Sequence, residues 1–268
     1  MRIIVPIKQV PETNAVKMDE ATGTMIREGV EAIINPLDLY AIELAIRLKE
    51  RHAGSEVIAI SMGPPKAMSA LKEAIAMGVD SAVLLSDKAF AGSDTWATSY
   101  VLSEAIKKLG KCDLVICGER ATDGDTGQVG PGIASFLDMP VASYVSGMDG
   151  PGKAPNTLRV RRLVEEGYEV LDVELPCVLT VVKEAADPRL PTLRGKQRAR
   201  AAEIPVWGTA NMTLQADKLG LNGSPTRVVK IFKPTVARNC QKLQATDEQS
   251  IQAAVDTLVE FLQKKELI

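Results

Sequence analysis

Histidine, cysteine and aromatic residues are scarce in this chain of 268 residues, which has one His, four Cys and 4% Phe, Trp and Tyr. The cysteines are scattered and form no C-x-x-C pair, which argues against a disulfide scaffold or a thiolate metal site. With His52 as the single histidine, a Ser-His-Asp triad or a histidine-rich metal site is not expected. Any redox chemistry would therefore come from a bound cofactor.

An excess of charge and a long apolar run are also missing. Lys plus Arg (32) nearly balances Asp plus Glu (34), so no global basic field exists to hold nucleic acid or an anionic membrane. No apolar stretch approaches the roughly 20 residues that a membrane helix needs. Residues 1–7 run straight into a strand-like segment instead of a leader. We therefore expect a cytoplasmic protein that binds neither nucleic acid nor a membrane.

In the first half of the chain, short apolar runs alternate with helical periodicity. Segments with the continuous apolar character of parallel strands covered on both faces are residues 3–7, 57–62, 82–85 and 114–118. Helical patterns lie between them, and Asn35 followed by Pro36 marks a helix start with Asn as the expected cap. This alternation predicts an α/β fold with a doubly wound, mostly parallel sheet.

Two hairpins are predicted in addition. Residues 158–164 and 168–175 alternate apolar with polar around Glu165-Glu166-Gly167, as in an antiparallel hairpin with one solvated face. Within residues 16–34, the turn signal Asp19–Gly23 predicts a hairpin excursion.

The last part of the chain differs in character. Residues 187–200 are basic and interrupted by prolines, and residues 202–234 show weak periodicity. A final amphipathic helix is predicted over residues 247–264. We therefore expect an α/β domain over residues 1–185 and an extended arm over residues 186–268 that packs on a partner chain.

Ligands of open parallel sheets bind outside the carboxyl ends of the strands, so the loops there are the candidate sites. The loop after the strand at 114–118 has glycines at 118, 124, 127 and 130 and threonines at 122 and 126. This composition is typical of a backbone cradle for phosphate or pyrophosphate beside a helix N-terminus. It is neither G-x-G-x-x-G nor a Walker A loop, and a glycine-rich loop without a ligand is the alternative.

Other candidate residues have two interpretations each. The segment Asn35–Asp38 either faces the same cleft or is an ordinary helix cap. Asp123 and Asp125 either cap backbone amides in a turn or bind Mg²⁺ as a D-x-D pair. Cys117 is interpreted as a core thiol in preference to a nucleophile.

Several motifs, in order, resemble the β subunit of electron transfer flavoproteins. They are Val5–Pro11, Ile34–Asp38 with Ala41–Glu43, Ala76–Asp80, Gly118–Gln128, and Leu175-Pro176 followed by Asp187–Arg189. The match runs from residue 1 to about residue 205, and the C-terminal stretch matches in layout more than in residues.

The resemblance implies a Rossmann-like fold of the adenine-nucleotide-binding type. It also implies a heterodimer with an α subunit that carries the electron-transferring FAD, and a site in this chain for AMP or a second FAD. Carried over position by position, the nucleotide contacts would come from Pro6, Asn35, Pro36, Leu37, Asp38, Met62, Cys117, Gly118, Glu119, Arg120, Ala121, Thr122, Asp123, Gly124, Asp125, Thr126, Gly127 and Gln128.

The basic, proline-containing segment matches the family's recognition loop, in which a leucine anchors the partner dehydrogenase. Leu193 falls at that place and Arg194 follows it, so both are expected to bind the partner.

Residues 123–131 resemble the members whose β site holds FAD and which split the electron pair of NADH, called bifurcation. The small residues Gly124 and Thr126 leave room for a pyrophosphate. We therefore favour FAD, with structural AMP in a non-bifurcating subunit as the alternative. Electrons would pass between NADH or an acyl-CoA dehydrogenase-type flavoenzyme and other acceptors, ferredoxin among them. On charge alone, Arg120 would favour a reduced, anionic flavin.

Two rival functions belong to other classes. One is a nucleotide-binding regulatory module without a redox role, which would not need the basic segment at 183–200. The other is an Mg²⁺-dependent nucleotide hydrolase built on Asp123 and Asp125.

Overall fold

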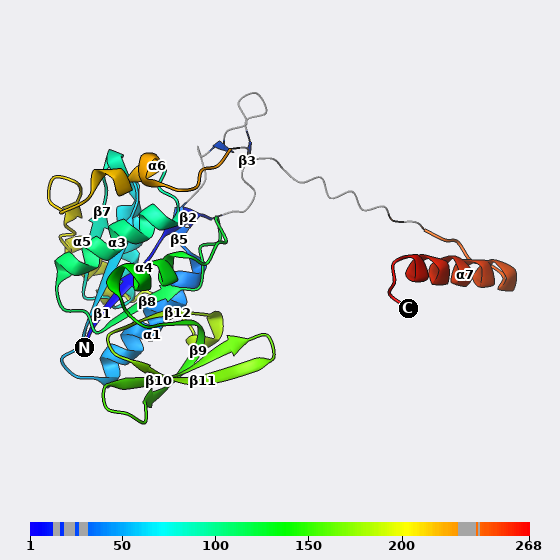
Figure 1. Ribbon diagram of the computed structural model, residues 1–268, viewed down its shortest axis with the longest axis horizontal. Coiled ribbons are helices and arrows are strands. Elements are labelled where there is room, and N and C mark those ends of the chain that lie inside the picture. The colour runs from blue at the N-terminus through cyan, green and yellow to red at the C-terminus, as the bar shows by residue number, and fades with distance from the viewer. Residues whose placement is uncertain (13–16, 19–24, 27–31, 230–239, 241) are drawn as a thin grey trace. The chain divides into compact units, whose positions relative to one another are not determined.

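The structure is a computed structural model that describes residues 1–12, 17–18, 25–26, 32–229, 240 and 242–268. The chain divides into two compact units, Met1–Val229 and Lys230–Ile268 (Figure 1).

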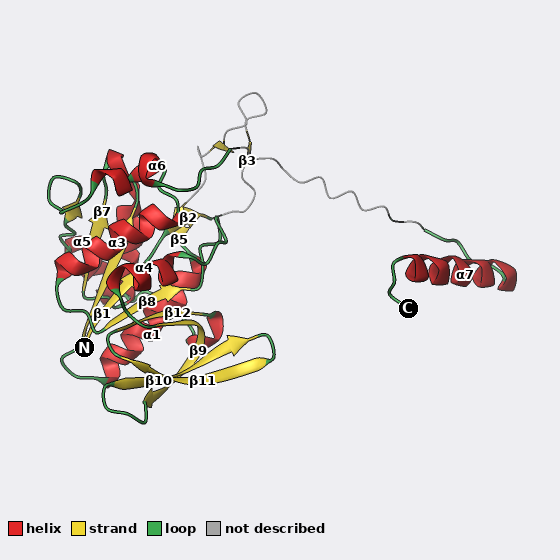
Figure 2. Cartoon of the chain, in the orientation of Figure 1, coloured by secondary structure: helices red, strands yellow, loops and turns green. Residues whose placement is uncertain are grey.

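A nine-stranded sheet in the order β11-β10-β9-β12-β8-β1-β6-β7-β13 forms the centre of the first unit (Figure 2). Its parallel middle part consists of β1 (Arg2–Pro6), β6 (Glu56–Met62), β7 (Ser81–Leu85), β8 (Leu114–Gly118) and β12 (Cys177–Val181). From β1 the chain winds to β6 and β7 on one side and then to β8 and β12 on the other. The predicted doubly wound, mostly parallel α/β fold is confirmed.

Helices cover both faces of this sheet. On one face lie α1 (Pro36–Arg51) and α2 (Met68–Met77), and on the other α3 (Thr95–Leu109) and α4 (Val129–Leu137). A hydrophobic core lies on each face of the sheet, and β1 contributes to both. Ile3 and Val5 pack with α1 and α2, whereas Ile4 packs with α3. Short 3-10 turns are η1 (Pro65–Ala67), η2 (Lys88–Phe90), η3 (Lys183–Ala185) and η4 (Ala216–Lys218).

The antiparallel part of the sheet contains β9 (Val141–Pro151), β10 (Thr157–Val164) and β11 (Gly167–Glu174). Strands β10 and β11 pair around the predicted turn, which confirms that hairpin. Two smaller antiparallel pairs are β2 (Gln9–Pro11) with β5 (Ala32–Ile34) and β3 (Lys17–Met18) with β4 (Met25–Ile26). The second pair lies in the predicted excursion, whose turn at 19–23 falls outside the described residues.

Residues 186–229 belong to the first unit. Helix α5 (Leu193–Ala201) packs against α2 with Ala199 buried, and β13 (Val206–Trp207) adds a parallel strand beside β7. The short helix α6 (Gly220–Gly223) follows. The first unit therefore extends to Val229, beyond the division at residue 185 expected from the sequence.

The second unit contains α7 (Glu248–Lys264), which confirms the predicted C-terminal helix. A capping box between Asp247 and Ser250 begins the helix. Its apolar side chains Ile251, Leu258 and Phe261 are exposed.

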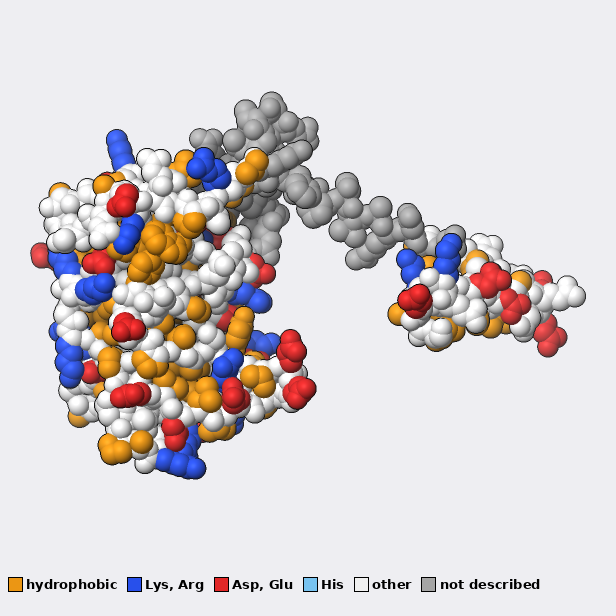
Figure 3. All heavy atoms as spheres, in the orientation of Figure 1, with side chains coloured by type: hydrophobic (Ala, Val, Ile, Leu, Met, Phe, Trp, Pro, Cys, Tyr) orange, Lys and Arg blue, Asp and Glu red, His pale blue; other side chains and the backbone are white. Residues whose placement is uncertain are grey.

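The near balance of acidic and basic residues in the sequence is also seen on the surface. On the face of the first unit seen in Figure 3, basic and acidic side chains are interspersed. Among the described residues, no helix has both the length and the apolar character needed to span a membrane.

Candidate functional site

The loops that follow β8, β1 and β6 meet at one edge of the sheet. These strands are parallel neighbours, so their carboxyl ends lie together at the point where the winding direction reverses. Lys8, which follows β1, pairs through Nζ with both carboxylate oxygens of Asp123 in the loop after β8, at 2.7 and 2.8 Å. The structure thus brings together the loops that the strand-end rule selects.

Asn35 lies beneath this edge and is completely buried. Its Nδ2 donates to the carbonyl oxygen of Arg120 and to Asp38 Oδ1, both at 2.9 Å, and its Oδ1 accepts from the Thr122 N–H at 3.1 Å. The expectation that its side chain caps α1 is wrong, because at the N-cap position it makes no capping hydrogen bond. Asn35 instead ties the start of α1 to the glycine-rich loop.

Asp38 is the buried carboxylate of the site. Its Oδ2 accepts from the Lys8 N–H at 2.7 Å, and Oδ1 accepts from Asn35. Burial raises its pKa to about 7, against the opposing effect of hydrogen bonds from Lys8, Asn35 and the Gly118 backbone and of the Lys8 charge. Asp38 therefore links three chain segments, and its protonation is set by how tightly they enclose it.

The loop between β8 and α4 is tied to β12 at its start and contains an internal turn. The Glu119 N–H donates to the Val181 carbonyl oxygen at 3.0 Å, and the Asp125 N–H donates to the Ala121 carbonyl oxygen at 2.8 Å. The guanidinium of Arg120 pairs with Asp125 at 2.8 Å, so it is engaged within the loop.

The end of this loop presents backbone donors. Gly127 has a φ of +64° and is followed by Gln128 in a right-handed helical conformation, an alternation that turns successive N–H groups toward one concavity. Among the described residues, none accepts a hydrogen bond from the backbone N–H groups of residues 126–130. These donors stand at the positive N-terminal end of α4, so the arrangement fits a phosphate or pyrophosphate group.

Cys117 packs beneath the same helix start. The residue is buried, and burial raises the pKa of its thiol well above the usual range. A Cβ on Gly130 would collide with the Thr180 side chain and would lie 3.7 Å from the Cys117 Sγ, so this glycine lets α4 begin close to β12, beside Cys117. Cys117 is therefore a packed thiol, not an activated nucleophile.

The other residues expected at the site take places around it. Pro6 and Met62 end β1 and β6, and Pro36 and Leu37 open α1. Gln128 Oε1 accepts from Thr95 Oγ1 at 2.9 Å. Leu193 and Arg194 lie on a separate surface, where α5 begins beside the end of α2.

Two further residues belong to the site and were not expected there. Lys8 lies in the motif Val5–Pro11, which follows a strand, so the strand-end rule could have placed it at the site. Tyr144 has a φ of +58°, rare for a residue with a side chain, and its hydroxyl lies 3.9 Å from where a Cβ on Gly127 would be. The register irregularity of β9 against β12 places it there, and no sequence pattern reports this.

The two carboxylates considered as Mg²⁺ ligands, Asp123 and Asp125, also lie in this loop. The described residues contain no group of three or more His, Cys, Asp or Glu that could hold a metal ion. Asp123 and Asp125 are instead paired with Lys8 and Arg120.

Replacing Asn35 by alanine should loosen the loop. The Arg120 carbonyl and the Thr122 N–H would lose their buried partner, at a cost of about 1–3 kcal/mol in the free energy of unfolding. Hydrogen exchange at the Thr122 amide should accelerate by at least about tenfold, while Asn222→Ala, at an exposed position, should change neither quantity. Unchanged exchange at Thr122 would show that Asn35 does not hold the loop.

Together, the doubly wound sheet and the candidate site at its reversal point define a protein with a Rossmann-like fold. The family model described as "Electron transfer flavoprotein domain" matches residues 22–211. The chain belongs to the electron transfer flavoprotein family, as a relative of its β subunits.

Relatives of this chain match it over nearly its full length. It is 46% identical to "Caffeyl-CoA reductase-Etf complex subunit CarD" of Acetobacterium woodii, over 100% of both chains. It is 45% identical to "Electron transfer flavoprotein subunit beta" of Thermoanaerobacterium thermosaccharolyticum, again over 100% of both. It is 41% identical to "Acryloyl-CoA reductase electron transfer subunit gamma" of Anaerotignum propionicum, over 97% of this chain and 98% of that protein.

Proposed function

We propose that this chain is the β subunit of a heterodimer whose α subunit carries the electron-transferring FAD. The complex passes electrons between NADH or an acyl-CoA dehydrogenase-type flavoenzyme and other acceptors. The names of two relatives, a subunit of a reductase–Etf complex and an acryloyl-CoA reductase electron transfer subunit, support this assembly.

The cofactor proposed for the site in this chain is a second FAD, with AMP as the alternative. The observation that carries it is the row of backbone N–H groups at residues 126–130, which suits the pyrophosphate of a dinucleotide. Gly124 has no heavy atom within 4 Å of a Cβ built on it, so the loop is open at that point. The flavin, when bound, supplies the electron-transfer chemistry.

The residues of this chain bind and orient the cofactor. Asn35 and Asp38 fix the distance between α1 and the loop, and Lys8 holds the loop through Asp123. A protein contributes binding and positioning to a cofactor reaction. We propose bifurcation between NADH and ferredoxin with these residues in the same two roles.

Two surfaces are proposed for partners. Leu193 and Arg194 face solvent at the start of α5 and are assigned to the dehydrogenase. The exposed apolar side chains Ile251, Leu258 and Phe261 of α7 are assigned to the α subunit, since such a stripe on a helix usually packs against a partner.

Co-expression with the α subunit tests the cofactor proposal. Nucleotides released from the purified complex by denaturation should amount to two FAD and no AMP per heterodimer. One FAD and one AMP would contradict FAD in this site and bifurcation, and would leave a non-bifurcating carrier. A flavin-free chain that binds ATP alone and ignores the α subunit would instead support the regulatory module.

A further inference from the structure

Tyr144 has a backbone conformation that its residue type rarely adopts. Its φ of +58° lies in the left-handed region. In the described part of the first unit, the other residues with a side chain and a positive φ are Asp125, Asp138 and Asn156, whose residue types tolerate this region. For an aromatic residue within a strand the conformation is strained, and strain of this kind is concentrated at functional sites.

A β-bulge in β9 accompanies this conformation. The register of β9 against β12 shifts between Leu179 and Val181, so that β9 has one extra residue there. A bulge bends its strand and re-aims a side chain. Here it turns the Tyr144 side chain toward Gly127, at the end of the loop between β8 and α4.

Thr180 ties the bulge to the start of α4. Its side chain is buried, and its Oγ1 accepts from the Tyr144 N–H at 3.1 Å. A Cβ on Gly130 would collide with the Thr180 methyl group, so the first turn of α4 lies directly against this side chain. Thr180 therefore fixes the backbone of Tyr144 relative to the N-terminal end of α4.

The hydroxyl of Tyr144 lies beside the unpaired backbone donors of residues 126–130. It is 3.9 Å from where a Cβ on Gly127 would be. The residue is 44% exposed, and no described residue hydrogen-bonds to this hydroxyl. The phenol donor and the backbone donors are therefore open to the same acceptor.

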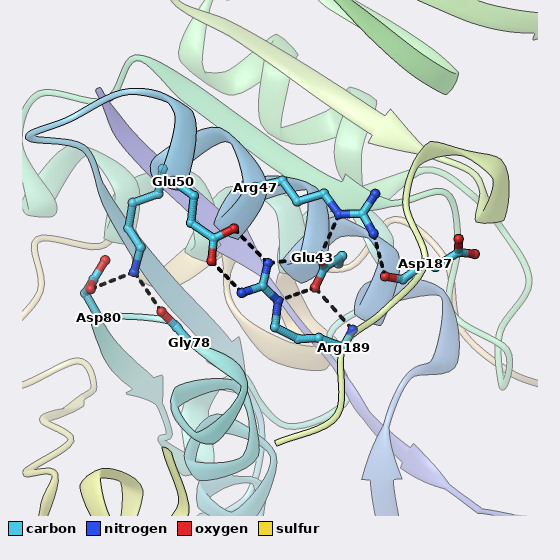
Figure 4. Close-up of polar contacts among 8 residues, drawn as sticks. Glu43, Arg47, Glu50, Gly78, Asp80, Asp187 and Arg189 are labelled. Atoms are coloured by element: carbon cyan, nitrogen blue, oxygen red, sulfur yellow. Dashed lines mark hydrogen bonds and ion pairs between the residues drawn. The ribbon is translucent and has the colours of Figure 1, made fainter. Parts of the chain in front are cut away.

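A polar cluster on α1 shows the contrast, because its groups are satisfied within the chain. The buried Glu43 carboxylate accepts from the guanidinium groups of Arg189 and Arg47, at 2.7 Å in each case (Figure 4). Arg189 also bonds to both carboxylate oxygens of Glu50, at 2.6 and 3.0 Å. Clusters that are saturated in this way offer nothing to a ligand, whereas the donors at the end of the β8–α4 loop do.

We propose that Tyr144 is a cofactor-binding residue whose hydroxyl donates to a phosphate oxygen held by the N–H groups of residues 126–130, and that Thr180 is a positioning residue for it. A phosphate group has several acceptor oxygens, and hydrogen bonds to such a charged acceptor are strong. The inference rests on the proposed function, since it takes FAD or AMP as the occupant, and both carry this phosphate.

Equilibrium dialysis of the αβ complex tests the hydroxyl. The nucleotide in the site of this chain is first removed by dialysis, and the Kd is then measured for FAD, AMP and adenosine. Tyr144→Phe keeps the ring and removes the donor, so the Kd for FAD and for AMP should rise about tenfold. The Kd for adenosine, which has no phosphate, should not change.

Thr180→Val tests the positioning role. Valine keeps a methyl group against Gly130 and lacks the oxygen that accepts from the Tyr144 N–H. We expect this variant to raise the Kd for AMP by no more than Tyr144→Phe does. The double variant should bind AMP as Tyr144→Phe alone does, because both changes remove the same contact.

Tyr168→Phe is the matched control. It removes the hydroxyl of a tyrosine that is 62% exposed on β11, and it should leave all three Kd values unchanged. An unchanged Kd for FAD and AMP in Tyr144→Phe would overturn the phosphate contact, and so would an equal rise for adenosine. An unchanged Kd in Thr180→Val, or additive effects in the double variant, would overturn the role of Thr180. If the wild-type complex binds neither FAD nor AMP in this site, the proposed function itself fails.

Discussion

Asp38→Asn should flatten the pH dependence of stability between about pH 4 and pH 7. A free aspartate has a pKa of about 3.9, whereas Asp38 in the folded chain has a pKa of about 7. The folded state therefore holds a proton that the unfolded chain releases in this window, and the free energy of unfolding falls as pH rises. The loss in the wild-type chain is on the order of 2–4 kcal/mol, and a permanently neutral asparagine removes it.

Urea unfolding at closely spaced pH values measures the effect. Asp123→Asn is the matched control, because Asp123 is a carboxylate of the same sheet edge that is exposed and paired with Lys8. It should keep the wild-type slope between pH 4 and pH 7. Equal slopes for the wild type and Asp38→Asn would show that Asp38 is ionised throughout this range, and the enclosure described for it would be wrong.

Much of the fold follows from patterns that are local in the sequence. Continuous apolar runs such as Ile3–Ile7 identify strands buried on both faces, and the order of strands and helices then predicts a doubly wound sheet. The same logic places the loop after β8 at the ligand edge. Strand β13 is two residues long, too short to show a period, so its pairing with β7 could not be predicted.

Side-chain roles at the site were harder to predict, because one pattern allows several geometries. An asparagine before a proline is typical of a helix cap, yet the Asn35 amide reaches a loop 85 residues away. Similarly, the motifs that contain Glu43 and Arg189 are 146 residues apart, and only the fold brings them together. Long-range polar partners are chosen by tertiary packing, which local sequence does not record.

Gly118→Ala should push the start of α1 away from β8 and so distort the site. A Cβ at this position would lie 2.9 Å from both the carbonyl carbon and the carbonyl oxygen of Leu37, and would also collide with the Asp38 carboxylate. Backbone atoms cannot rotate away, so the start of α1 must move from β8. We expect a loss of about 1–3 kcal/mol in the free energy of unfolding and at least about tenfold weaker nucleotide binding.

Gly124→Ala is the matched change in the same loop. No heavy atom lies within 4 Å of a Cβ built there, and the residue has no positive φ, so folding stability should be unchanged. If the pyrophosphate of FAD lies at this point, the added methyl group should lower FAD content in the purified complex and leave AMP binding intact. Two FAD per heterodimer in Gly124→Ala would place the pyrophosphate elsewhere. Equal free energies of unfolding for Gly118→Ala and Gly124→Ala would contradict the close contact of β8 with α1. The pair of variants thus separates the room that the loop offers a ligand from the packing that holds the loop in position.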